Sequence, residues 1–102
     1  MTRSMLASAL AMALAGAAPA AADTPATPPI AEGCAGCHGQ SGSGMGQIPR
    51  IAGYDRTEFI HVWQEFRDNA RPATIMNRIA RGYTDDEVAA LADYFSALER
   101  DQ

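Results

Sequence analysis

Two cysteines and a histidine stand within five residues of each other, where positions 34–38 read CAGCH. Two thiols separated by two residues and followed at once by a histidine form the attachment pattern of c-type haem. Cys34 and Cys37 lie one helical turn apart, so both can form thioethers with vinyl groups on one edge of a porphyrin. His38 then presents its imidazole to the iron. The motif predicts one covalent haem c with His38 as an axial iron ligand.

Two other chemistries of paired cysteines compete with this interpretation. A thioredoxin-like dithiol would stand within a βαβ pattern, and the sequence contains no such pattern. A zinc site would require further ligands, but His61 is the sole other histidine and there is no third cysteine. Haem attachment is therefore favoured over a redox dithiol and over zinc.

The haem iron has a second axial position, on the side away from His38. If no residue fills that position, O₂ or peroxide can bind there and react. If a residue ligates the iron there, the haem can only transfer electrons. The candidates are Met45, Met76 and His61. His61 lies opposite the apolar face of its predicted helix. Met45 follows His38 by only seven residues, which at about 3.3 Å per residue barely spans the porphyrin edge. Met76 is the predicted ligand, with a core side chain as the alternative, and a closed iron would transfer electrons without binding a substrate.

The elements that position these residues are helical. Prolines at 28 and 29 favour a helix that starts near Thr27 and runs into the haem motif. Asp55 and Glu58 predict the start of a second helix that ends at about Arg67. One face of that helix carries its large apolar residues at helical spacing: Phe59, Val62, Trp63 and Phe66.

The C-terminal half adds a short helical turn after Met76, which carries Ile79 inward, and a last helix. Thr84 and Glu87 form a capping-box pattern at its start. Its apolar stripe consists of Val88, Leu91, Ala92, Phe95 and Leu98. No segment alternates like a strand, and the glycine-rich stretch at 39–46 is predicted to be a loop. We expect an all-α fold of about four helices around one haem, with the first helix crossing the last.

The first 22 residues have the pattern of an export signal. Arg3 precedes an uncharged run at 5–15 that is too short to span a bilayer. Small residues follow, and we expect cleavage after Ala22, or after Ala20. An uncleaved N-terminal anchor is the alternative. The pattern predicts export to a bacterial periplasm and a mature chain without a stable membrane span.

Residues 23–102 are then expected to form a single domain, which has unusually few residues suited to a hydrophobic core. Of the 48 apolar residues in the chain, 16 fall in the first 22 positions. Leu, Ile, Val and Phe account for 13 of the remaining 80 residues, below the roughly 20% that is usual for a packed core. A covalent haem would supply the missing apolar centre, so we expect the chain without haem to be largely unfolded.

The charge of this domain bears on its partners. It holds 7 Arg and 12 acidic residues, hence 7 − 12 = −5, and no Lys. Nucleic acid is therefore excluded as a partner. Arg71, Arg78 and Arg81 flank Met76 and are candidates for docking a partner protein, with plain solvated side chains as the alternative. Trp63 and Tyr54 are candidate hydrogen-bond donors to a haem propionate, although packing in the core is the alternative role for Trp63.

From about Ile30 to Leu98 the sequence resembles the class I cytochromes c. The segments CAGCHG, IPRIAG and TIMNRIARGYTDDEVAALADYF are similar to those of the cytochrome c4/c553 group. The last segment looks most like the haem subunit of flavocytochrome c sulfide dehydrogenase. The resemblance implies thioethers at Cys34 and Cys37, iron ligands at His38 and Met76, and orientation of the histidine by the Pro49 carbonyl.

The resemblance also implies a function. The haem subunit would take single electrons from an FAD-containing flavoprotein that oxidises sulfide, as one half of a heterodimer, and would catalyse no reaction alone. Many such haem subunits carry two haem domains, whereas this sequence has one CxxCH motif. The implied alternatives are a monohaem version of the complex and a free periplasmic c4/c5/c553-like carrier to a terminal oxidase or other acceptor.

Overall fold

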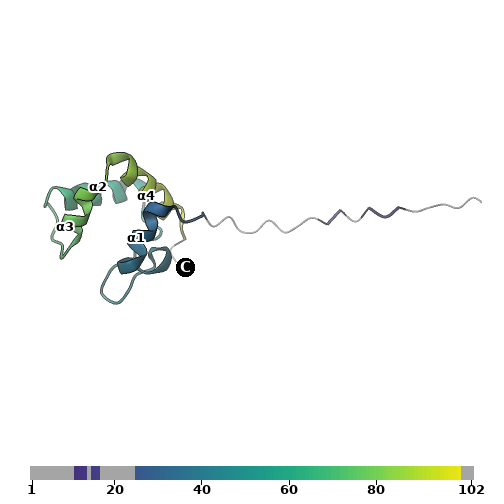
Figure 1. The fold of residues 1–102 in the computed structure, drawn as a ribbon, viewed down its shortest axis with the longest axis horizontal. Coiled ribbons are helices and arrows are strands. Elements are labelled where there is room, and N and C mark those ends of the chain that lie inside the picture. Colours follow the sequence, from purple (N-terminus) through teal and green to yellow (C-terminus); the bar gives the residue numbers. More distant parts are fainter. Residues whose placement is uncertain (1–10, 14, 17–24, 100–102) are drawn as a thin grey trace, which may run out of the picture.

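The computed structural model describes residues 11–13, 15–16 and 25–99 (Figure 1). The predicted export signal at 1–22 therefore falls for the most part outside the described residues. Four α-helices follow one another in the described chain: α1 (Pro29–His38), α2 (Arg56–Arg67), α3 (Met76–Ile79) and α4 (Asp85–Ala97). Two 3₁₀ turns join them, η1 (Gln40–Gly42) and η2 (Ala80–Gly82). The expected all-α fold of about four helices is confirmed.

The helices begin where the capping residues predict. Pro28 is extended and Pro29 opens α1. The Asp55 carboxylate accepts a hydrogen bond from the Glu58 amide at 3.0 Å, at the start of α2. Thr84 and Glu87 bond reciprocally at the start of α4, with N···O distances of 3.2 and 2.9 Å. Each cap satisfies amide donors that the first helical turn leaves without partners.

The core is formed where α2 packs on α4, and aromatic rings dominate it. Phe59 of α2 stacks on Phe95 of α4 with ring centroids 5.9 Å apart, and Trp63 stacks on Phe59 at the same separation. All five residues predicted for the apolar stripe of α4 are buried. Tyr94, which that stripe did not include, is buried as well, and its hydroxyl lies 2.8 Å from Thr27 Oγ1 just before α1. This bond ties α1 to α4, as the expected crossing requires.

Side chains of α2 tie down the segment of α3 and η2. Trp63 Nε1 donates to the Ala80 carbonyl at 3.2 Å, and Arg81 Nε donates to the Arg67 carbonyl at 3.3 Å. Arg67 in turn donates to the Tyr83 carbonyl at 3.1 Å. The segment that begins with Met76 is therefore anchored to α2 although it has few turns of its own.

The segment between α1 and α2 differs from a plain loop. It contains η1 and one isolated β-bridge between Met45 and Ile48, which is the sole β pairing in the described part of the chain. Within the same part, no helix combines the length and the hydropathy that a membrane span requires.

Candidate haem site

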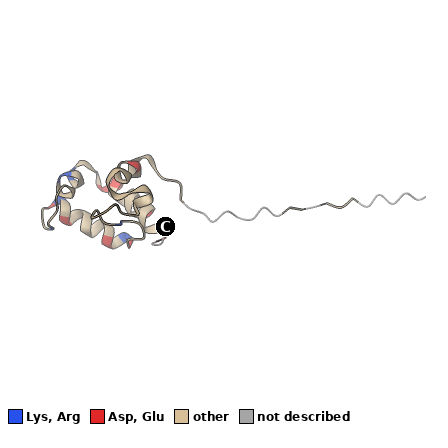
Figure 2. Ribbon diagram, turned by 90° about the horizontal axis from the view of Figure 1, so that it is seen from below, with Lys and Arg blue, Asp and Glu red and all other residues tan. Residues whose placement is uncertain are grey.

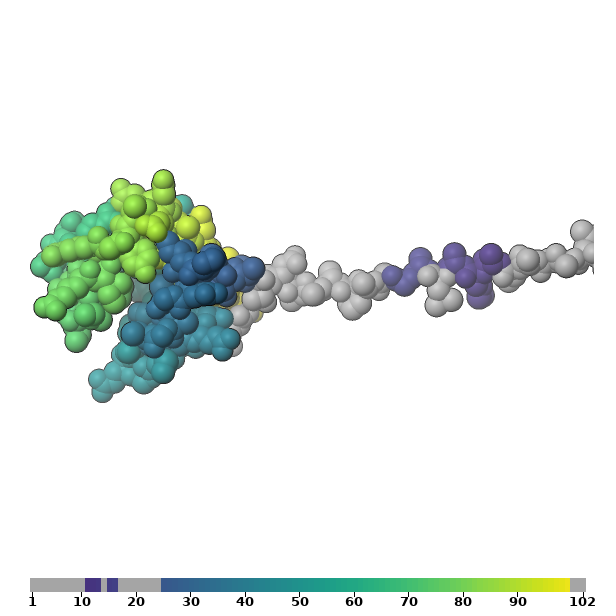
Figure 3. Space-filling model, in the orientation of Figure 1, coloured from purple at the N-terminus to yellow at the C-terminus, as the bar shows by residue number. Residues whose placement is uncertain are grey.

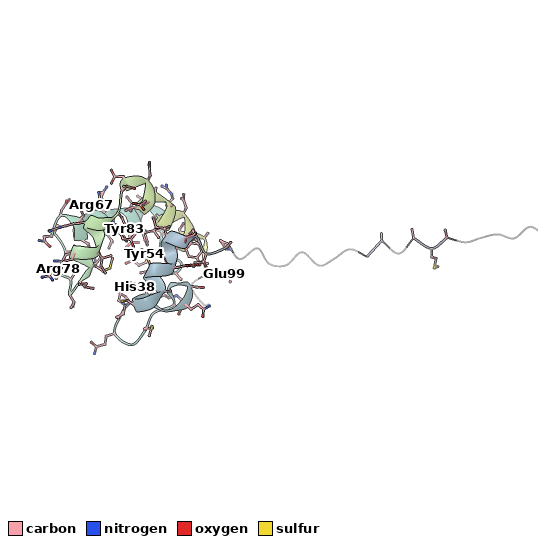
Figure 4. The ribbon with its side chains drawn as sticks, in the orientation of Figure 1. His38, Tyr54, Arg67, Arg78, Tyr83 and Glu99 are labelled. Carbon is pink, nitrogen blue, oxygen red and sulfur yellow. The ribbon has the colours of Figure 1, made fainter. Side chains whose placement is uncertain are left out.

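A cavity of about 390 Å³ opens between α1 with its following loop and the segment of α3 (Figure 3). This volume lies in the range of small-molecule and cofactor pockets. Its walls are mainly apolar, with Phe59, Trp63 and Phe66 of α2 at the base. Figure 4 shows His38 on one side, Arg78 on the opposite side, and Tyr54 and Tyr83 between them.

The α1 wall carries Cys34, Cys37 and His38, so the structure brings the whole motif to one face of the cavity. The two thiols form no disulfide. Cys34 is half-buried, and burial raises the pKa of its thiol, while Cys37 is exposed. The two cysteines, one helical turn apart, therefore both lie at the cavity.

His38 is oriented by a backbone carbonyl. Its Nδ1 lies 2.7 Å from the Pro49 oxygen. A carbonyl oxygen only accepts hydrogen bonds, so Nδ1 carries the proton and Nε2 of the neutral ring keeps its lone pair. Metal-ligating histidines almost always donate the other ring N–H in this way. The hydrogen bond implied by the resemblance is present, and it selects the tautomer that can ligate iron.

The opposite wall is formed by Ile75, Met76 and Ile79. Met76 is the first residue of α3 and is half-buried. Ile75 and Ile79 are 47% and 37% exposed, and both line the cavity, as does Ile48 on the α1 side at 40%. Large apolar side chains exposed to a shared cavity are the expected lining for a flat apolar macrocycle. The donors and the walls together fit a haem.

The other candidates for the second axial position lie elsewhere. His61 is on the outer face of α2, where its side chain is 71% exposed and Nε2 is 2.9 Å from a Glu65 carboxylate oxygen. Met45 is 53% exposed, and neither residue lines the cavity. No group of three His, Cys, Asp or Glu that could hold a metal ion occurs within the described ranges. Met76 alone among the three candidates reaches the cavity wall.

Trp63 and Tyr54 both line the cavity, but the polar atom of Trp63 is already engaged. The Trp63 indole N–H is already donated to Ala80 O, and the residue is 5% exposed. The Trp63 ring therefore lines the cavity, whereas its N–H is hydrogen-bonded to the protein backbone. Contact between Trp63 and a haem stays a prediction.

A comparison with protein families decides the identity of the fold. The family model described as "Cytochrome c" matches residues 28–99. The chain belongs to the cytochrome c family. Membership implies a covalently bound haem c, and the geometry of the CAGCH motif and the cavity agrees with that implication. The cytochromes c are electron carriers, and the covalent haem that membership implies is attached through paired cysteines, which excludes the dithiol and zinc interpretations.

This cytochrome is similar to several curated relatives. It is 35% identical to the cytochrome subunit of sulfide dehydrogenase from Chlorobaculum tepidum, over 74% of this chain and 76% of that protein. It is 33% identical to cytochrome c-554(548) from Halomonas halodenitrificans, over 65% of this chain and 84% of that protein. It is 36% identical to a thiosulfate dehydrogenase electron acceptor from Stutzerimonas stutzeri, over 62% of this chain and about a third (31%) of that longer protein.

The sequence did not predict two apolar residues that line the cavity from outside the helices. Ile48 and Ile75 line the cavity from segments without helical periodicity. Their only sequence signal is that each is a large apolar residue next to a predicted site residue, Pro49 in one case and Met76 in the other. This signal becomes informative only when the position of the haem is already assumed.

Proposed function

We propose that this cytochrome carries one haem c and accepts single electrons from the FAD-containing subunit of a sulfide dehydrogenase in the bacterial periplasm. The observation that carries the proposal is the similarity to the cytochrome subunit of sulfide dehydrogenase, which extends over about three quarters of both chains. The single CAGCH motif supports one haem per chain. The signal-like sequence at 1–22 supports export and a mature domain at 23–102.

The residues of the cavity have separate roles in this proposal. When bound, haem c supplies an Fe(III)/Fe(II) couple. Cys34 and Cys37 would hold the group by thioethers, and His38 and Met76 would ligate its iron. A methionine ligand in addition to histidine would raise the reduction potential and would leave the iron no free position for O₂ or peroxide. Pro49 keeps the His38 ring in the ligating tautomer.

The segment at 69–83 is the proposed docking surface for the flavoprotein. It contains Arg71, Arg78 and Arg81 and no acidic residue, although the chain as a whole is acidic. Arg71 lies 3.4 Å from a Glu65 carboxylate. The exposed Arg78 guanidinium has neither a hydrogen bond nor an ion pair in the described part of the chain. Figure 2 shows basic residues at the α3 end of the domain.

Arg78 stands between Ile75 and Ile79, which are exposed at the mouth of the cavity. An unpaired cation beside exposed apolar residues is suited to an acidic partner surface with an apolar centre. Opposite charges on two proteins increase the association rate more than the affinity. The proposal therefore predicts fast, salt-sensitive reduction of this cytochrome by its partner.

The test is stopped-flow reduction of the haem-loaded protein by a sulfide dehydrogenase flavoprotein subunit. The rate constant should fall as ionic strength rises, and Arg78→Glu should lower it at least threefold at low salt. Arg56→Glu is the control, because it changes the charge equally on the side where Arg56 pairs with Asp93. Equal rates for the two variants at all salt concentrations would disprove docking at Arg78.

A free carrier is the second candidate function, because the chain also matches cytochrome c-554(548), whose name denotes no dehydrogenase subunit, over 84% of that protein. The two candidates differ in whether a stable complex exists. Co-purification of the native protein with an FAD-containing chain would support the subunit role. Two results together would favour the free carrier. The cytochrome would elute alone at its own mass, and sulfide plus the flavoprotein would reduce it no faster than sulfide alone.

A further inference from the structure

Pro49 presents its carbonyl to His38 from an exposed loop. The turn of this loop is closed by two bonds between Met45 and Ile48, at 3.1 and 2.8 Å. Those bonds precede Pro49 and involve neither its carbonyl nor the residues after it. The position of the Pro49 carbonyl therefore depends on what fixes the chain immediately downstream.

Three successive amides fix that downstream chain. The amides of Ile51 and Ala52 both donate to a single acceptor, the Gly42 carbonyl, at 2.9 and 3.1 Å. The Gly53 amide donates to the Phe95 carbonyl at 2.8 Å, which joins the same stretch to the last turns of α4. The segment at 51–53, which follows Pro49, is therefore hydrogen-bonded both to η1 and to α4.

Gly42 can act as this double acceptor only because it is glycine. It is buried and has a φ of +69°, in the region that disfavours other residues. A Cβ on Gly42 would lie 2.7 Å from Ile51 Cγ1 and 2.8 Å from Phe95 Cε1. The side chains of Ile51 and Phe95 therefore pack directly against the α-carbon whose carbonyl holds the loop.

We propose that Gly42, Ile51 and Phe95 form a latch that positions the Pro49 carbonyl on His38 Nδ1, and so tunes His38 as an iron ligand; of the three, only Ile51 lines the haem cavity. A carbonyl that accepts from Nδ1 makes Nε2 a more basic ligand. A more basic ligand favours the ferric state. Opening the latch weakens this bond, so the reduction potential of the haem-loaded protein should rise.

The direct test compares Gly42→Ala with Gly46→Ala in the haem-loaded protein. Gly46 lies in the same loop at a φ of +56°, but a Cβ there would meet nothing within 4 Å. Gly42→Ala should raise the reduction potential and should speed hydrogen exchange of the Ile51 and Ala52 amides and of the His38 Nδ1 proton by at least tenfold. Gly46→Ala adds the same backbone strain without the contacts. The exchange rates of the two amides and of the His38 proton should stay within twofold of the wild type, and the reduction potential should be unshifted.

A merely structural role for Gly42 gives a different result. In that case Gly42→Ala would speed exchange of the two amides and leave the His38 proton and the reduction potential as in the wild type, which would overturn the proposal. So would an equal shift of potential in both variants.

The wild-type protein provides a test that does not depend on the folding of a variant. If one latch holds the loop and His38 together, the His38 Nδ1 proton and the amides of Ile51, Ala52 and Gly53 should show a common opening free energy, obtained by dividing each exchange rate by the intrinsic rate of that proton, because one opening exposes them all. A His38 proton whose opening free energy differs from that of the three amides, higher or lower, would contradict the latch.

Discussion

Trp63 links the core to the segment that carries Met76, and Trp63→Phe tests that link. The indole N–H is donated to the carbonyl of Ala80, a residue that is fully buried immediately after α3. Phenylalanine keeps an aromatic ring but has no donor. The substitution therefore leaves the Ala80 carbonyl buried without its partner.

The expected cost has two parts. An unsatisfied buried carbonyl costs about 1–3 kcal/mol. The smaller ring also loses contact with Phe59, on which Trp63 stacks, and with Tyr83, which meets it edge-on at 5.2 Å, and this loss of apolar burial costs about 1 kcal/mol. A total of about 2–4 kcal/mol corresponds, in a domain of this size, to a fall in Tm of about 10–20 °C.

The assay is denaturant and thermal unfolding of the haem-loaded protein, followed by visible absorbance and circular dichroism. Tyr83→Phe is the matched control, because the Tyr83 hydroxyl makes no hydrogen bond within the described residues and its removal should change stability by less than about 0.5 kcal/mol. If Trp63→Phe were as stable as the wild type, the bond to Ala80 would not anchor this segment, and the reasoning from the structure would be refuted.

Three further predictions concern the iron ligand, the last helix and the cofactor. Met76→Ala should abolish the ferric methionine–iron charge-transfer band, whereas His61→Ala, at a residue on the outer face of α2, should leave the visible spectrum unchanged; retention of the band in Met76→Ala would exclude this ligand. Thr84→Ala should lower the free energy of unfolding by about 1 kcal/mol, measured by thermal melting, because it removes the Oγ1 that accepts from the Glu87 amide, while the backbone amide at 84 keeps its bond to the Glu87 carboxylate. The mature chain without haem should show little helical circular dichroism, and a cooperative melting transition in that form would contradict the prediction.

The sequence was sufficient for those features that depend on local chemistry. The starts of α2 and α4 follow from Asp55 and Thr84, whose side chains bond within three residues of themselves. The α4 stripe follows from helical periodicity, and the haem motif is contiguous. His61 was correctly placed away from the apolar face by the same periodicity.

Features that depend on contacts across the fold could not be predicted in this way. The acceptor of the Trp63 N–H is a carbonyl 17 residues away, and the sequence, which favoured core packing for Trp63 over a bond to a propionate, could not identify it. The role of Gly42 depends on Phe95, more than fifty residues later, and the sequence indicated only a glycine-rich loop. The exposure of Ile75 and Ile79 has a reason only once the cavity is seen to lie between α1 and α3.

The central claim is that this chain holds one haem c through Cys34 and Cys37. The most direct measurement is the mass and pyridine haemochrome spectrum of the denatured protein after expression with the haem-maturation machinery. The account predicts a mass of the mature chain plus one haem, a haemochrome typical of two thioether bonds, and loss of covalent haem in a Cys34→Ala, Cys37→Ala double variant. A colourless protein in which both thiols react with an alkylating reagent would contradict it.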